Sequence, residues 1–243
     1  MYYKLLISFL ILIVLVICFR NYLPKISFFN NKPQTLESNI NNYEKELAKY
    51  DEAIKLNPND ALAYFARGVI LYYLGKYELS LISYDKAIEL DPKNFAFYLN
   101  QGASFQALNK YELALEAYNK AIRLNPNEAN SYNNQGEVFR VLGKYEQAIK
   151  SLNKAIELDH NNPSAYYNKG LTLHQLGKYE LAVETYNKAI DLNPKSFKAY
   201  FAKGYALTLL NKYDEALEAY NKAIEINPDY FTAYFYKGVL FYV

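Results

Sequence analysis

The sequence predicts an all-α protein, an α-solenoid of antiparallel helix pairs that follows an N-terminal transmembrane helix. Two observations predict the solenoid. Glycine recurs every 34 residues through most of the chain, and each interval contains two stretches with apolar residues at helical spacing. A third observation, an apolar run near the amino terminus, predicts the membrane helix. Repeats of this length stack so that each unit buries an apolar face on its neighbours.

The period is defined by several residue types in one register. A tyrosine stands four residues before each repeating glycine, a Lys-Tyr pair follows (first copy Lys76-Tyr77), and an Ala-Ile pair comes next (first copy Ala87-Ile88). Most units close with Asp or Asn before proline, and His160 takes the place of proline in one unit. The signature glycines and prolines are Gly68, Gly102, Gly136, Gly170, Gly204, Gly238, Pro92, Pro126, Pro194 and Pro228.

Each unit is predicted to form two helices, which span residues 61–74 and 77–90 in the first unit. Gly68 and its copies are expected where the two helices cross, because a larger side chain would overpack the contact at a cost of ~1–3 kcal/mol. Residues that tolerate a left-handed conformation end the first helices, namely Gly75, Gly143, Gly177, Asn109 and Asn211. On the first helix, one stripe at helical spacing is formed by Leu62, Phe65, Val69 and Tyr72, and another by Tyr64, Gly68 and Leu71. The expected buried face of the second helix is Tyr77, Leu81, Tyr84, Ala87 and Ile88.

The amino terminus carries an apolar run from Leu5 to Phe19, interrupted only by Ser8. A membrane-spanning helix needs ~20 apolar residues, with ~17 as the lower limit, so this run predicts a short anchor flanked by Lys4 and Arg20. Two alternatives are a cleaved secretory signal, although no Ala-x-Ala site lies nearby, and a lipoprotein acylated at Cys18. We expect a single-pass membrane protein, and the basic residues lean slightly toward a cytoplasmic body.

These features divide the chain into nine segments. The half repeat matches only a second helix, with Glu46 where alanine belongs, and is suited to cap the array. The segments are an anchor (1–20), a polar linker (21–40), a degenerate half repeat (41–60), five full repeats (61–94, 95–128, 129–162, 163–196 and 197–230) and an incomplete repeat with a first helix only (231–243).

Composition excludes several classes of function. The formal net charge of +2 leaves no concentrated basic surface, so we expect no nucleic-acid partner. One cysteine cannot form an intrachain disulfide, and His160 and His174, 14 residues apart, do not make a credible zinc site. His174 has no evident nucleophile or oriented carboxylate in sequence, and no phosphate-binding loop is present. We therefore expect no enzymatic activity, no metal and no cofactor.

The repeat resembles the tetratricopeptide repeat (TPR), and the resemblance covers residues 43–243. It implies a right-handed superhelix whose first helices line a concave groove that receives peptide segments. The second unit carries the matching residues Tyr98, Gly102, Phe105, Ala114, Tyr118, Ala121 and Pro126. The family's leucine before the glycine is replaced by Arg67, Gln101, Gln135, Lys169, Lys203 or Lys237, an alanine by Ser80, and an aromatic residue by Leu152.

The resemblance also implies which residues line the groove. Asn100, Asn134 and Asn168 recur at one repeat position and are here called the asparagine row. An amide both donates and accepts, so the row suits the backbone of an extended peptide; alternatively, these amides are solvated or tie helices together. Arg140, His174 and Lys198 could attract a carboxylate. The expected groove residues are Asn100, Asn133, Asn134, Arg140, Tyr167, Asn168, His174, Gln175, Phe201 and Tyr205.

The last segment has a first helix without a second helix behind it, so Tyr234, Leu240, Phe241 and Val243 have nothing to pack against. Three explanations are open: a truncated reading frame, pairing with another copy of the chain, and contact of the apolar tip with the membrane. The expected function is a membrane-tethered scaffold, anchored through residues 5–19, that binds peptide segments of other proteins and aids their assembly, quality control or localisation. The alternatives are a self-associating structural subunit and the accessory domain of a larger enzyme.

Overall fold

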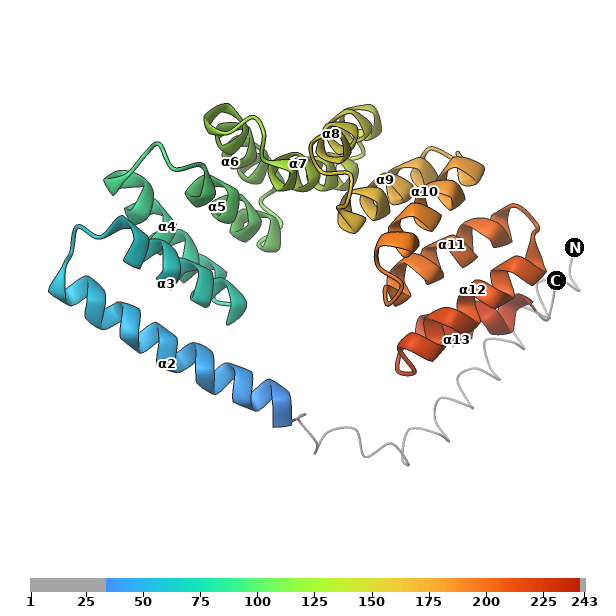
Figure 1. Ribbon diagram of the computed structural model, residues 1–243, viewed down its shortest axis with the longest axis horizontal. Helices are drawn as coiled ribbons and strands as arrows, with labels where there is room; N and C mark the ends of the chain where they lie inside the picture. Colours follow the sequence, from blue (N-terminus) through green and yellow to red (C-terminus); the bar gives the residue numbers. More distant parts are fainter. Residues whose placement is uncertain (1–33, 241–243) are drawn as a thin grey trace, which may run out of the picture. The chain divides into compact units, whose positions relative to one another are not determined.

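A computed structural model describes residues 34–240, with side chains described from residue 41. Over this range the protein is all α, with twelve helices and no strands (Figure 1). The predicted anchor and most of the predicted linker lie outside the described residues. No helix among the described residues has both the length and the apolar character that crossing a bilayer requires.

The chain divides into two compact units, residues 1–48 and 49–243, and helix α2 crosses the boundary between them. The helix pairs described below all belong to the second unit. The helices are α2 (Gln34–Leu56), α3 (Ala61–Tyr73), α4 (Tyr77–Leu90), α5 (Phe95–Ala107), α6 (Tyr111–Leu124), α7 (Ala129–Val141), α8 (Tyr145–Leu158), α9 (Pro163–Gln175), α10 (Tyr179–Leu192), α11 (Phe197–Leu209), α12 (Tyr213–Ile226) and α13 (Phe231–Val239).

Helix α2 differs from the sequence prediction. It begins at Gln34, inside the segment predicted to be a linker, and continues for 23 residues. No proline or glycine interrupts this stretch, so nothing in it breaks a helix even though its first residues are polar. The polar composition of residues 34–40 suggested a linker, but the absence of helix breakers was the better guide.

The ends of the helices follow the repeat. The first helix of each full repeat is capped by a side chain that accepts hydrogen bonds from backbone N–H groups of the first turn. These caps are also 34 residues apart: Asp60, Asn94, Glu128, Asn162 and Ser196. The predicted left-handed residues are confirmed at the ends of these helices, with φ of 71° at Gly75 and 58° at Asn109, for example. Helix α8 ends at Leu158 although His160 replaces the proline, so the proline is not needed to stop it.

One contact recurs in every helix pair and holds its two helices together. The second helix of each full repeat contributes one fully buried side chain, and a Cβ atom added to the signature glycine of the first helix would meet it at 2.4–2.7 Å. The prediction that these glycines lie at the crossing is therefore confirmed. The five contacts are Gly68 with Tyr84, Gly102 with Tyr118, Gly136 with Leu152, Gly170 with Tyr186 and Gly204 with Tyr220.

Two expectations about burial have different outcomes. Of the two stripes predicted on α3, the one with Gly68 and Leu71 is buried at these two residues, whereas Leu62 of the other stripe is 63% exposed in the first turn of the helix.

On α13, Phe231, Tyr234 and Phe235 are exposed, and no atom of a described residue lies within 4 Å of a Cβ added to Gly238. The exposure of Tyr234 agrees with the expectation that it has little to pack against. The expectation was wrong for Leu240, which packs against the buried cluster that contains Leu207 and Tyr220, because the first helix of this segment lies on α11 and α12 even without a second helix behind it. Phe241 and Val243 lie outside the described residues.

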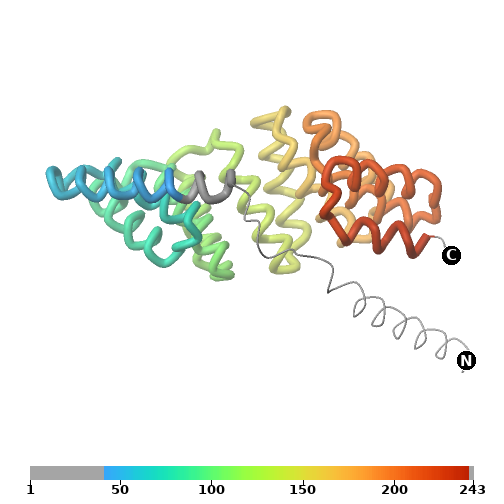
Figure 2. The backbone as a smooth tube through the Cα atoms, turned by 90° about the horizontal axis from the view of Figure 1, so that it is seen from below, coloured from blue at the N-terminus to red at the C-terminus, as the bar shows by residue number. Residues whose placement is uncertain are grey.

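Consecutive helix pairs are joined in two ways. From α4 to α12, each even-numbered helix packs against the next odd-numbered one, and the odd-numbered helices α3, α5, α7, α9 and α11 also contact each other from pair to pair. Figure 2 shows the pairs following one another in the order of the sequence. We call the side formed by these odd-numbered helices the inner face. Because the helices contact each other from pair to pair on one side of the stack only, the stack is curved. The inner face therefore lies on the inside of the curve.

Polar side chains join the pairs on the opposite, outer side. The Arg67 guanidinium bonds the carboxylate of Asp51 in α2 and the hydroxyl of Ser83 in α4, each at 2.7 Å. Gln135 repeats this arrangement, donating to Asn119 at 2.7 Å and accepting from Ser151 at 2.6 Å. These residues replace the leucine that the TPR family usually has, so the departure from the family pattern exchanges an apolar contact for a bridge between successive even-numbered helices.

Candidate functional site

Two adjoining hollows mark the inner face. The first, of about 390 Å³, lies across α3, α5 and α7, and the second, of about 340 Å³, lies across α7, α9 and α11. Glu137 of α7 lines both, so the hollows follow one another along the inner face. The first is lined by Tyr72, Ala103, Gln106, Ala107, Asn109, Tyr118, Asn134 and Glu137. The second is lined by Asn133, Glu137, Pro163, Ser164, Tyr167, Asn168, Ala189, Asn193, Ser196 and Lys198.

The asparagine row does not present three equivalent free amides. Asn168 is 7% exposed and donates to the side-chain oxygen of Asn133 at 3.1 Å, which ties α9 to α7. Asn133, also 7% exposed, donates in turn to the side-chain oxygen of Asn134 at 3.1 Å. Asn100 donates to the backbone oxygen of Ala96 within its own helix. The sequence left open whether these amides bind a peptide or tie helices together. The second alternative applies to Asn168 and its partner Asn133.

Asn134 is the member of the row that combines partial exposure with a place in a hollow. Burial raises the pKa of the nearby Tyr118 hydroxyl, and the Glu137 carboxylate adds to the rise, whereas a hydrogen bond with Asn134 lowers that pKa. The Tyr118 hydroxyl donates to Gln106 at 2.8 Å. Asn134, Glu137, Gln106 and Tyr118 thus form one polar group at the first hollow.

The different roles of the asparagines predict different effects on stability. Replacing Asn168 by alanine removes the donor to a buried amide oxygen of Asn133, so we expect the free energy of unfolding to fall by about 1–3 kcal/mol. Asn100→Ala removes only a bond to a carbonyl of the same helix, and we expect a change within about 0.5 kcal/mol. Urea unfolding followed by circular dichroism measures both; equal losses would contradict the structural role of Asn168.

Arg140 and His174 lie one repeat apart on α7 and α9, at the same repeat position. The Arg140 side chain makes no ion pair or hydrogen bond with any described residue, and its Nε atom is buried without a partner. The His174 ring stacks on Tyr205 at 5.1 Å between ring centroids and contacts Tyr179, and its Nε2 is also buried without a partner. Burial lowers the pKa of His174. The structure thus leaves unpaired nitrogen atoms on both residues.

The aromatic candidates form contacts that run toward α13. Phe201 and Tyr205 of α11 each pack against the ring of Tyr236, at 5.4 and 5.1 Å between centroids. Tyr167 packs against Tyr186 at 6.2 Å and lines the second hollow. Gln175 is exposed at the end of α9. Of the ten predicted groove residues, Asn133, Asn134, Tyr167 and Asn168 line the two hollows.

Sequence reasoning gave no weight to Gln106, Glu137 and Tyr118 as one polar group. The pairing of Gln106 with Tyr118 has a signal in the sequence, namely a spacing of 12 residues between the polar residue and the buried tyrosine. The same spacing separates Thr208 and Tyr220 of the fifth repeat, whose hydroxyls bond at 3.1 Å. Ser164, Asn193 and Ser196 line the second hollow because the turn before α11 comes close to the start of α9. No spacing rule within one repeat predicts that approach.

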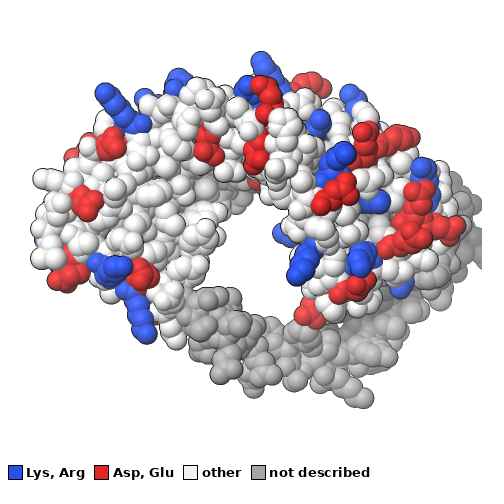
Figure 3. Space-filling model, in the orientation of Figure 1, with Lys and Arg blue, Asp and Glu red and all other residues white. Residues whose placement is uncertain are grey.

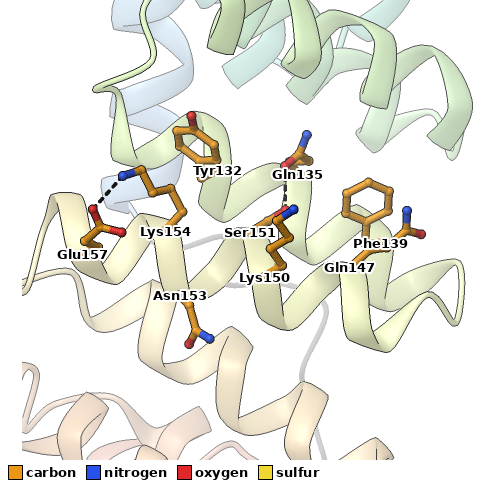
Figure 4. A pocket seen from close by; sticks show the side chains of 9 residues that line it. All are labelled: Tyr132, Gln135, Phe139, Gln147, Lys150, Ser151, Asn153, Lys154 and Glu157. Atoms are coloured by element: carbon orange, nitrogen blue, oxygen red, sulfur yellow. Dashed lines mark hydrogen bonds and ion pairs between the residues drawn. The ribbon is translucent and has the colours of Figure 1, made fainter.

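A larger hollow of about 620 Å³ lies on the outer side, along α7 and α8 (Figure 4). Two pairs among its polar side chains bond each other: Ser151 donates to Gln135 at 2.6 Å, and Lys154 bonds Glu157 at 2.6 Å. A hollow with equivalent residues lies one repeat later, along α9 and α10. The hollow along α7 and α8 therefore lies at the bridge that Gln135 forms between repeats.

The charges are mixed on the face that Figure 3 shows, where Lys and Arg alternate with Asp and Glu and no broad area of one sign is present. Among the described residues, no group of three or more His, Cys, Asp or Glu side chains is placed to hold a metal ion. The two hollows of the inner face are lined by amides, hydroxyls and aromatic rings, with few charged groups. This composition suits a polypeptide ligand more than a phosphate-rich one.

The helix pairs, their repeat and the hollowed inner face define a helical-repeat protein of the solenoid class. Sequence profiles described as TPR repeat and tetratricopeptide repeat match residues 40–75, 61–94, 95–128, 117–150, 136–177, 167–231 and 197–243. Together these matches leave no gap from residue 40 onward. The chain belongs to the tetratricopeptide repeat family, whose members mediate protein–protein interactions.

Solved structures resemble the chain over most of its length. The crystal structure of YrrB, a TPR protein with an unusual peptide-binding site, is 27% identical with a TM-score of 0.59, and the match covers 78% of this chain and 97% of YrrB. The structure of MamA is also 27% identical with a TM-score of 0.59, covering 69% of this chain and 92% of MamA. PilF from Pseudomonas aeruginosa shares the fold at 20% identity, with a TM-score of 0.70 and coverage of 82% and 90%. No curated protein sequence matches the chain.

Proposed function

We propose that the protein is a non-enzymatic scaffold that binds an extended segment of another protein along its inner face. The observation that carries this proposal is the pair of adjoining hollows that share Glu137, which together cross five successive odd-numbered helices. A groove that runs across five helices suits an extended chain better than a compact small molecule. The YrrB structure, a TPR protein with a peptide-binding site, supports the proposal.

We further propose that residues 5–19 tether this scaffold to a membrane, so that the groove acts on partners near the bilayer. The apolar run from Leu5 to Phe19 supports this part of the proposal. The partners would be membrane-associated or passing the membrane, and binding would aid their assembly, quality control or localisation. The basic residues on either side of the run lean toward a body on the cytoplasmic side.

Affinity capture from native membranes tests the groove. The full chain is compared with an inner-face variant, Glu137→Ala with Lys198→Ala, and with an outer-face control, Gln147→Ala with Lys150→Ala, which lines the hollow of Figure 4. We expect the control to retain the partners of the unmodified chain and the inner-face variant to lose most of them, because only the latter changes the groove.

Both variants replace surface side chains, so circular dichroism and unfolding by urea should show that each remains folded. If the inner-face variant recovers the same partners as the control, the groove is not the working surface. Recovery of partners by neither variant would show that binding depends on both faces, and would contradict a groove-centred scaffold.

A further inference from the structure

We infer that copies of the chain associate head to tail, so that residues 49–56 of α2 in one copy cover the open side of α13 in another. The inference goes beyond the proposed groove, because it concerns the first and last described helices rather than the inner face. Helix α13 occupies the place of a first helix in the 34-residue register, and α2 occupies the place of a second helix. Among the described residues, neither is paired within its own repeat as the helices of the five full repeats are.

The signature glycine of α13 lacks the contact that the other five make. In each full repeat a Cβ atom added to this glycine would meet a buried side chain of the second helix at 2.4–2.7 Å, whereas no atom of the described chain lies within 4 Å of a Cβ added to Gly238. The tyrosine four residues before the glycine is partly buried in every full repeat, but Tyr234 is 46% exposed. This side of α13 therefore has room for the second helix of a repeat, and the exposed ring of Phe231 extends its apolar surface.

Helix α2 shows the complementary feature, a second helix whose side chains are incompletely covered. Tyr50 lies in the register of Tyr84, which is fully buried in the first full repeat. Ala53 lies in the register of Ala87, and this alanine is at most 1% exposed in all five full repeats. Tyr50 and Ala53, by contrast, are only half-buried, and the Lys49 ammonium lies 5.7 Å from the centre of the Tyr50 ring. Tyr50 is thus a tyrosine of the kind that packs on the signature glycine, with no such glycine opposite it in the described chain.

Pairing α13 of one copy with α2 of another would repeat a packing contact that the chain makes in each full repeat. In the common register, the Tyr50 ring of one copy enters the space beside Gly238 of the other. Asp51 bonds Arg67 and so holds α2 at the start of the array, five helix pairs away from α13. The α2 that reaches α13 therefore belongs to a second copy, and the interface continues the packing found inside each copy.

The rim of the contact follows from the same register. In the second repeat the Lys120 ammonium of α6 lies 5.7 Å from the centre of the Tyr98 ring of α5. The residues in these two positions at the ends of the array are Glu52 of α2 and Tyr234 of α13, and both are exposed. Glu52 of one copy is therefore expected beside Tyr234 of the next. Glu46, where four full repeats have alanine, precedes residue 49 and stays outside the contact with the nine residues of α13.

The charges on the two surfaces are balanced. Lys237 of α13 lies in the register of Arg67, which bonds Ser83 of its own second helix at 2.7 Å. In α2 that serine position is Lys49, and Glu52 follows one turn later, so Lys237 faces one charge of each sign. Exposed charge pairs contribute little net free energy, so burial of the aromatic side chains is expected to supply most of the affinity.

The proposed contact joins two different surfaces, so it leaves an open α2 in one copy and an open α13 in the other. Head-to-tail contacts of this kind extend into rows or close into rings, unlike the contact of a two-fold dimer. We therefore expect association to continue beyond the dimer as the concentration of the chain rises.

Thiol cross-linking of the full chain tests the pairing. The one cysteine, Cys18, is replaced by serine, and two single-cysteine chains are made in this background, Glu52→Cys and Tyr234→Cys, both at exposed positions. The chains are purified in detergent, mixed and treated with a short bismaleimide. We expect a cross-linked dimer in the mixture and little in either chain alone, because only the mixture brings residue 52 of one copy to residue 234 of another.

The control mixture combines Glu52→Cys with Gln175→Cys, at the exposed end of α9, and gives the background of random collisions. A mixture of Glu52→Cys and Tyr234→Cys that yields no more dimer than this background overturns the inference. A Tyr234→Cys chain that cross-links to itself as well as the mixture does would show that two α13 helices pair with each other, which also overturns the head-to-tail contact.

Sedimentation equilibrium of the full chain in density-matched detergent tests the centre of the contact. Gly238→Val fills the space that the Tyr50 ring enters and is expected to weaken association about tenfold, with an unchanged circular dichroism spectrum. The outer-face variant Gln147→Ala with Lys150→Ala changes neither end of the array and should associate like the unmodified chain. Equal association of the Gly238→Val chain and the unmodified chain would overturn the contact and assign association to another part of the chain, such as residues 5–19.

The capture experiment separates this contact from the peptide groove. Gly238→Val leaves the residues of both inner-face hollows unchanged, so it should recover the same partner proteins as the unmodified chain. Retained partners together with lost self-association would support two independent surfaces. A full chain that stays monomeric at every concentration while it recovers its partners would overturn the head-to-tail contact and leave the groove standing.

Discussion

Replacing Tyr118 by alanine is expected to lower the free energy of unfolding by about 3–5 kcal/mol, as for other large buried aromatic residues. The ring is fully buried, and it fills the space over Gly102, whose missing side chain is what allows the helices to approach. Without the ring, α5 and α6 face each other across a cavity that the backbone cannot close without losing its contacts with α4 and α7. Urea unfolding measures the total, and hydrogen exchange shows whether the loss is confined to α5 and α6.

Tyr118→Phe is the matched control. It keeps the ring and removes only the hydroxyl that bonds Gln106, so we expect a loss of about 1 kcal/mol. If Tyr118→Phe and Tyr118→Ala lower the free energy of unfolding equally, the hydroxyl rather than the ring holds α5 and α6 together. The explanation of the glycine–tyrosine contact by packing would then be wrong.

Gly170→Val is expected to be nearly as damaging, with a loss of about 3 kcal/mol, at the upper end for an overpacked contact. A Cβ at this position would lie 2.4 Å from the Tyr186 ring, and that ring is fully buried and has no room to move. Gly238→Val is the control, since it changes the equivalent glycine of α13, where no atom of the described part of the chain lies within 4 Å of the added Cβ. Thermal or urea unfolding should show a large loss for the first and little change for the second.

If both variants lose the same free energy of unfolding, the cause is the conformation of the helix backbone rather than crowding, because both glycines are helical and only Gly170 is crowded. A tolerated Gly170→Val would mean that α9 and α10 separate easily, which the recurrence of the same contact in five repeats argues against.

The helices and the contact between the signature glycine and the buried side chain were predictable because the same residue types recur in the same register in successive repeats. A tyrosine or glycine seen once has many explanations, whereas the same pair in the same register through successive units has few. The bounds predicted for 61–74 and 77–90 agree with α3 and α4 to within one residue. Residues 34–40 were misjudged because they lie before the repeat begins, where only composition was available.

Contacts between repeats were harder to predict, because they depend on how far each pair is rotated against the next. Ser80 was noted as a departure from alanine, but its partner Ser104, at 2.7 Å in the next helix pair, follows only from that rotation. The same applies to Asn168, which lines the second hollow but whose amide nitrogen is already bonded to Asn133 of the preceding repeat. The candidate site was thus predicted at the level of the face that carries it, and less well at the level of which side chains are free.

The repeat-by-repeat contacts also bear on how such a chain can change length. Because each odd-numbered helix contacts only its neighbours along the array, adding or removing one whole unit of 34 residues leaves every remaining helix with the same kind of neighbour. What would change is which polar residue lies beside which on the inner face, as at Asn133 and Asn168. Length and recognition chemistry are therefore separable in this protein, so gene duplication of single units can alter its partners without a new fold.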